Sequence, residues 1–128
     1  MTQPTVVPSA RSYSDTIARL KNAIVNGGAR LFAEIDQAKA ASEVGLNLRP
    51  TTLLVFGNPK GGTPLMDAFP LSALDLPLKL LIWEDNEKVS VAYMSPRAIA
   101  ERYGITGKDA LIAAMEAQLV HLAGSVAS

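Results

Sequence analysis

The chain has 128 residues, of which 48% are hydrophobic and 19% are charged, and it contains no cysteine. A chain of this length forms one domain with its own core, so we expect residues 1–128 to fold as a single domain. Twelve basic residues balance twelve acidic ones, which disfavours nucleic acid as a partner, and the missing cysteines exclude disulfides, thiolate nucleophiles and cysteine-ligated metals.

The first predicted elements are an edge strand at residues 5–8 and a helix that starts after Ser12. Ser12 and Asp15 have the spacing of a capping box, in which the first side chain bonds to an amide three residues further on. Apolar residues then recur every three or four positions. Gly27-Gly28 ends the helix, because glycine adopts a left-handed conformation at low cost.

A second strand and a short helix come next. The alternation of residues 31–36 predicts a strand, with Leu31, Ala33 and Ile35 on one face and Phe32, Glu34 and Asp36 on the other. The alanine-rich residues 37–44 predict a short helix that Gly45 closes.

Two nearly continuous apolar runs, Thr51–Phe56 and Leu78–Trp83, predict central strands. Residues 89–94 alternate and form a predicted hairpin with the second run. A short helix from Ser95-Pro96 to Gly104 and a last helix at about residues 107–123, opened by Thr106 with Asp109, complete the chain. Because strands and helices do not alternate strictly, the sequence favours an α+β fold: a single mixed or antiparallel sheet of about four to five strands packed against helices.

The glycine-rich stretch Gly57–Met66 is the main candidate site. Thr63 is its predicted N-cap and Pro64 suits the first helical turn. It is not a P-loop, because Thr63 stands where that motif requires lysine. One interpretation is a tight connection in which the glycines supply positive φ. The other is a site for a small molecule or anion near a helix N-terminus, with these ligand-binding candidates: Lys60 for charge, Gly61, Gly62 and Thr63 for amides, and Glu34 and Trp83 along the pocket.

No residue pattern predicts a catalytic centre, a metal site or a cofactor. The single histidine, His121, lies near the end of the last helix without a predicted partner for general base catalysis. An enzyme would instead use Glu34 or Glu84 as an acid–base group, partly buried near the glycine-rich stretch. A solvated strand face and an ordinary turn are the favoured explanation of these two carboxylates.

The last helix predicts assembly. Its inward stripe is Leu111, Met115, Leu119 and Leu122, yet further apolar residues such as Ala113, Ala117 and Val120 surround that stripe. A helix that is apolar on most sides is usually buried on two of them, and closed dimers are the commonest assembly. We therefore expect a homodimer with this helix at the interface.

The sequence also predicts a location. Its longest apolar runs have the length of strands and are too short to cross a bilayer, and residues 1–10 lack the features of a signal peptide. A cytoplasmic protein without a membrane partner is the expectation.

Several segments together resemble a known family. Gly57-Asn58-Pro59-Lys60-Gly61-Gly62-Thr63-Pro64-Leu65-Met66 is similar to the signature of the bacterial and archaeal domain of unknown function 302 family. The resemblance covers roughly residues 10–105 and extends over Phe32–Asp36, Leu48–Thr52, Leu74–Lys79 and Trp83–Asp85. The resemblance implies a small α+β domain with helices packed on a β-sheet, and it implies a dimer. It supplies no established reaction.

One position departs from the family pattern. Members similar to this chain often carry histidine directly after the Ile-Asp pair, where this chain has Gln37. Glutamine neither titrates near neutral pH nor binds metal as imidazole does, which disfavours an enzyme. The leading hypothesis is a non-enzymatic domain that binds a small ligand beside Gly57–Met66; the alternatives are a structural or partner-binding homodimer without ligand and the carboxylate enzyme.

Overall fold

The computed structural model describes residues 3–128, and one sheet organises it. In chain order the elements are β1 (Thr5–Pro8), α1 (Tyr13–Asn26), β2 (Arg30–Asp36), α2 (Gln37–Glu43), β3 (Thr51–Gly57), α3 (Pro59–Ala68), the 3₁₀ helix η1 (Pro70–Leu74), β4 (Leu78–Asp85), β5 (Lys88–Tyr93), α4 (Pro96–Tyr103) and α5 (Asp109–Gly124). The first two residues of the expected single domain lie outside the described part.

The sheet has five strands in the order β1-β5-β4-β3-β2, and every neighbouring pair is antiparallel. β1 and β2 are the two edges, as expected for the strand that ends at Pro8. The β4–β5 hairpin closes through Asn86 and Glu87, both with positive φ, a geometry that matches the twist of the paired strands. The predicted α+β fold with a single sheet is confirmed.

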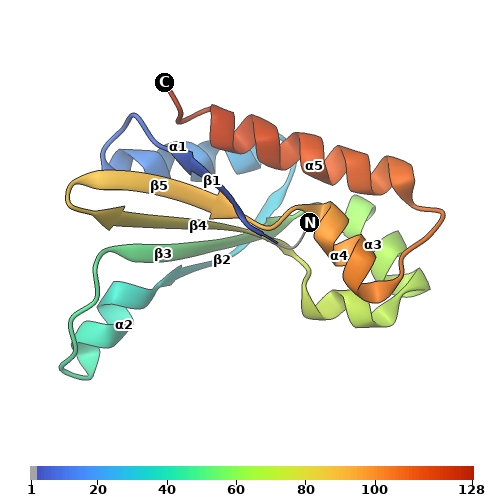
Figure 1. The fold of residues 1–128 in the computed structure, drawn as a ribbon, viewed down its shortest axis with the longest axis horizontal. Coiled ribbons are helices and arrows are strands. Elements are labelled where there is room, and N and C mark those ends of the chain that lie inside the picture. Colours follow the sequence, from blue (N-terminus) through green and yellow to red (C-terminus); the bar gives the residue numbers. More distant parts are fainter. Residues whose placement is uncertain (1–2) are drawn as a thin grey trace.

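Helices α1 and α5 cover one face of this sheet (Figure 1). On that face the side chains of Leu54, Leu80 and Ile82 are fully buried, together with Leu20 of α1 and Leu119 of α5. The opposite face carries the alternate positions of the same strands. Figure 1 shows α2 at the end of the sheet away from α3 and α4.

Local signals explain most element boundaries. The Ser12 side chain accepts a hydrogen bond from the amide of Asp15 at the start of α1, and Gly104 ends α4 in the left-handed conformation, both as predicted. α5 differs, since its N-cap is Lys108 and no side chain caps it. The proposed Thr106–Asp109 start is therefore wrong by a few residues.

A β-bulge in β2 makes the predicted facing of its side chains partly wrong. Leu31 pairs with Phe56, whereas Ala33 pairs with Val55, so the register shifts around Phe32. An extra residue in one strand reverses the face of the residues before it. Leu31 consequently lies on the helix-covered face, while Ala33 and Ile35 lie on the other.

In residues 3–128, no helix has the length and apolar character needed to cross a membrane.

Candidate functional site

The glycine-rich stretch forms the start of α3 rather than a loop before it. The N-cap is Asn58, whose side chain accepts a hydrogen bond of 3.0 Å from the amide of Lys60, and Pro59 is the first helical residue. Thr63 and Pro64 therefore lie inside the helix, and the prediction that they begin it is wrong. Asparagine followed by proline outcompetes them, because Asn caps strongly and Pro lacks an amide that would go unpaired at the first position.

The amides of Gly61 and Gly62 are engaged within the helix. Each donates to the carbonyl oxygen of Asn58 at 2.9 Å. These two N–H groups therefore point along the helix and are not a cradle for an anion.

Neither glycine is required by the backbone. Gly61 and Gly62 do not have positive φ, so the idea that they solve a turn geometry is wrong. A Cβ atom on Gly61 would meet nothing within 4 Å, and one on Gly62 would meet only Cε of Met66, at 3.6 Å. A residue with a side chain would therefore fit at either position without a close contact.

The space beside these glycines is a cavity of about 390 Å³, called here the α3 cavity. Its walls come from the start of α3, from the link between η1 and β4, and from one side of α5, with Met66, Leu76, Pro77, Leu111, Met115 and Gln118 among the lining side chains. Leu111 and Met115, predicted as part of the inward stripe of the last helix, are only partly buried because they face this space. Among residues 3–128, no charged side chain lines the α3 cavity, and the polar side chains that line it are Asn58, Thr63 and Gln118.

The structure brings three of the six predicted ligand residues to the α3 cavity. Gly61, Gly62 and Thr63 line it. Lys60 is exposed and is not among the lining residues. Ligand binding by any of the four stays a prediction.

Glu34 and Trp83 lie on opposite faces of the sheet. Glu34 pairs in register with Leu54 on the helix-covered face, where its carboxylate accepts from Nζ of Lys21 at 2.7 Å. Trp83 pairs with Ser90 on the other face. The two side chains therefore cannot line one pocket, which corrects that part of the predicted site.

The alternative carboxylate, Glu84, lies far from the glycines. It is six residues beyond Leu78 along β4, a separation of roughly 20 Å at about 3.3 Å per residue. Glu84 lies near Tyr13. Burial is the main cause that raises the pKa of the Tyr13 hydroxyl, and the negative charges of Asp36, Glu34 and Glu84 raise it further. Over residues 3–128, no group of three or more acidic, histidine or cysteine side chains is placed to hold a metal ion.

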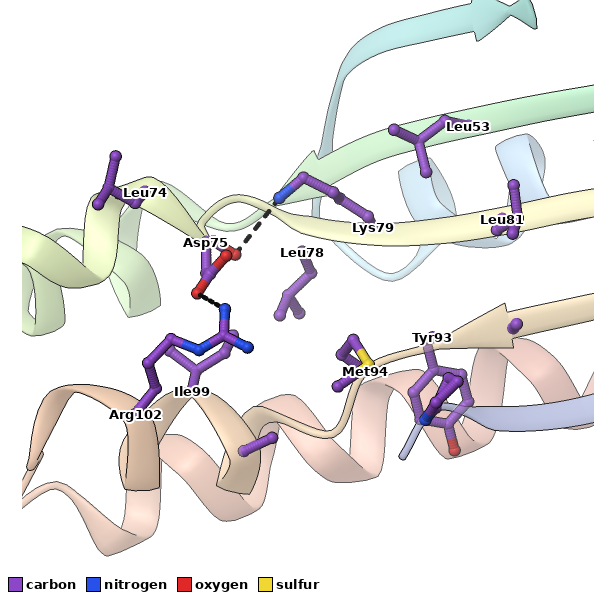
Figure 2. A pocket seen from close by; sticks show the side chains of 13 residues that line it. Leu53, Leu74, Asp75, Leu78, Lys79, Leu81, Tyr93, Met94, Ile99 and Arg102 are labelled. Carbon is purple, nitrogen blue, oxygen red and sulfur yellow. Dashed lines mark hydrogen bonds and ion pairs between the residues drawn. The ribbon is translucent and has the colours of Figure 1, made fainter. Parts of the chain in front are cut away.

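A second cavity, of about 340 Å³, lies on the sheet face opposite α1 and α5 and is called here the sheet cavity (Figure 2). Leu53, Leu81 and Ala92 pair with one another across β3, β4 and β5 and supply its floor. η1 and α4 close one end. No residue pattern predicts this cavity, although Leu74–Lys79, part of the family resemblance, contributes to its lining.

Charged side chains gather at that closed end (Figure 2). Arg102 Nη1 and the Tyr103 hydroxyl both donate to Oδ2 of Asp75, each at 2.7 Å. The hydrogen bond from Tyr103 is the main reason that the pKa of Asp75 lies below its usual value, with Arg102 acting in the same direction against partial burial. Lys79 Nζ donates to the backbone carbonyls of Pro77 and Asp75, at 3.1 and 3.4 Å.

These features define a class: a small α+β domain with an open antiparallel sheet, helices on one face, and one cavity on each side of the η1–β4 link. The chain belongs to the family described as "Domain of unknown function DUF302", whose model matches residues 5–122. The suspected resemblance is thereby confirmed.

A solved structure shares this fold. The chain superposes on the crystal structure of an uncharacterized conserved DUF302 protein from Bacillus stearothermophilus with a TM-score of 0.87, covering 96% of this chain and 97% of the other. The two sequences are 18% identical, so the likeness concerns the fold alone.

Curated relatives are longer proteins. The chain is 38% identical over 111 residues to proteins named "Fluoride-specific ion channel FluC 1" from Brucella suis and Brucella abortus. The matched part covers 85% of this chain but only 44% and 41% of those relatives.

Proposed function

We propose that this chain is a binding domain for a small, neutral and largely apolar ligand that occupies the α3 cavity. The observation that carries the proposal is the pair of glycines at Gly61 and Gly62. Glycine inside a helix is less favourable than alanine by roughly 0.5–1 kcal/mol. Since neither φ nor crowding requires glycine at these positions, keeping the cavity open is the reason that remains.

The lining supports a neutral ligand. Ligand sites are typically apolar, with a few polar groups that set orientation, and Asn58, Thr63 and Gln118 fill that role here. An anion is disfavoured because the amides of Gly61 and Gly62 are already bonded and because Lys60 is not a lining residue.

In the longer relatives, a region similar to this chain is one part of a larger protein. Their fluoride-channel name belongs to whole proteins, of which the region similar to this chain is less than half. For that region we propose ligand binding without catalysis. A cytoplasmic location is part of the proposal and is supported by the absence of cysteine, because disulfides are rare in that compartment.

The test combines mass spectrometry with a titration. Native mass spectra of the freshly purified protein report any co-purified molecule as extra mass that denaturation releases. Titration of ¹⁵N-labelled protein with n-hexanol, a neutral apolar probe, should then shift amide signals of residues 57–66 and 111–118. The variant Gly61→Leu, which fills the cavity, should abolish these shifts; shifts that persist in this variant, or that never occur in the native protein, overturn the proposal.

We also propose that the chain forms a homodimer, and the segment after α2 supports it. α2 has seven residues, none of them buried, although short helices depend on packing for stability. Val44, Leu46 and Leu48 beside it are 73%, 64% and 44% exposed. Such a cluster is typical of an interaction surface, and a second copy of this chain is the proposed occupant.

A further inference from the structure

We propose that the sheet cavity is a second binding site, specific for a small organic anion with an aliphatic body, such as a short-chain carboxylate. This inference is independent of the ligand proposed for the α3 cavity. It rests on an apolar floor and a cationic end within one cavity.

The floor offers burial to a hydrocarbon chain. Leu53, Leu81 and Ala92 lie side by side on neighbouring strands, and Met94 and Ile99 extend the apolar surface toward α4. A volume of about 340 Å³ is at the lower end of the range for small-molecule sites. Each methylene group that the ligand buries here adds favourable binding free energy.

The charged end of the sheet cavity has more positive than negative side chains. Of the described residues that line the sheet cavity, Asp75, Lys79 and Arg102 are the charged ones, and their side chains sum to a net charge of +1. The Asp75 carboxylate accepts from both Arg102 and Tyr103, so it is already engaged within the fold.

Both cations keep donors for a ligand. An ammonium group has three N–H donors and a guanidinium has five. Lys79 uses two on backbone carbonyls, which are neutral, and Arg102 uses Nη1 on Asp75. Lys79 and Arg102 both bond to Asp75 and both line this cavity. In the proposed complex, the carboxylate of the ligand lies at this end and neutralises the excess positive charge.

The two cavities therefore differ in the charge they select. In the described part of the chain, no charged side chain lines the α3 cavity, whereas the sheet cavity has a cationic end. Hexanoate, n-hexanol and hexylamine have chains of the same length with negative, zero and positive charge, so they separate the contribution of charge from that of burial.

The experiment is a titration of the ¹⁵N-labelled full chain with each of the three probes near neutral pH. Hexanoate should produce saturable shifts at residues 53, 79–81, 92–94 and 98–102, and hexylamine should not. Lys79→Met should weaken hexanoate binding at least about tenfold, because a charge-assisted hydrogen bond is lost, and Lys79→Arg should retain most of it.

Controls make each outcome decisive. Lys60→Met removes an exposed lysine that lines neither cavity and should leave hexanoate binding unchanged. Thermal unfolding verifies that each variant is folded. The proposal is overturned when hexanoate gives no saturable shift at these residues, when hexanol binds there equally well, or when Lys79→Met binds hexanoate as Lys60→Met does. Loss of hexanol binding at the α3 cavity has no bearing on these results, so the two proposals fail separately.

Discussion

Tyr103 donates a hydrogen bond of 2.7 Å to Oδ2 of Asp75, a residue 28 positions earlier in the chain. The bond connects α4 to the end of η1 and thus closes one end of the sheet cavity. Arg102, the neighbour of Tyr103, adds an ion pair to the same oxygen. One carboxylate therefore positions two side chains of α4.

Asp75→Asn is expected to lower stability in a pH-dependent way. The pKa of Asp75 in the folded protein lies below its ordinary value of 3.8, mainly because Tyr103 donates to the charged form. The stabilisation is therefore complete above that ordinary value. As the pH falls through the folded pKa it is lost, because the unfolded chain takes up the proton first.

Urea unfolding of the native protein and of Asp75→Asn, from about pH 7 down to about pH 3, measures this difference. The gap between the two should be widest near neutral pH and should narrow in acid. A gap that stays constant across this range would show that the charge of Asp75 contributes nothing to stability.

Gly61→Ala is expected to stabilise the chain and to reduce the space for a ligand. The added Cβ meets nothing within 4 Å, so the free energy of unfolding should rise by roughly 0.5–1 kcal/mol. Affinity for n-hexanol should fall in the same variant. Gly124→Ala is the matched control, since Gly124 is a helical glycine with open space around it outside the α3 cavity, and it should not change hexanol binding.

The elements that sequence predicted well are those whose signals are local. The Ser12 cap and the Gly104 stop need only the residues beside them. Where two local signals compete within a few residues, the choice is less certain. The helix begins at Asn58-Pro59 and not at Thr63-Pro64, so Gly61 and Gly62 lie in the helix and not in a loop before it.

The candidate site depended on relations that sequence does not carry. The faces of Glu34 and Trp83 follow from strand register, and the bulge near Phe32 alters that register. The sheet cavity needs Asp75 and Arg102, 27 positions apart, to meet across a turn and two strands. Neither relation appears as a spacing in the chain, so only the glycine-lined part of the site was predictable.

Glu34→Gln tests whether that carboxylate has more than a surface role. Its ion pair with Lys21 joins side chains that are 38% and 39% exposed, and such pairs contribute at most about 1 kcal/mol. The variant should therefore unfold within about 1 kcal/mol of the native protein. Lys21→Met should behave alike, and the double variant should lose little more than either single one, as measured by urea unfolding. A much larger loss in Glu34→Gln than in Lys21→Met would point to a role for Glu34 beyond this pair.

Two charge substitutions distinguish the possible surfaces of the proposed homodimer. Leu46 lies in the exposed apolar cluster after α2, and Ala117 lies on the exposed side of α5. Leu46 offers more apolar area than Ala117, so Leu46→Glu should convert the dimer to monomer, because the introduced carboxylate would lose its hydration at the interface. Ala117→Glu should leave the protein dimeric. Native mass spectrometry and light scattering measure the mass, with circular dichroism to confirm folding. If only Ala117→Glu dissociates the dimer, the interface lies on α5 and not at the cluster after α2. If the native protein is monomeric even at high concentration, the proposal of a homodimer is wrong.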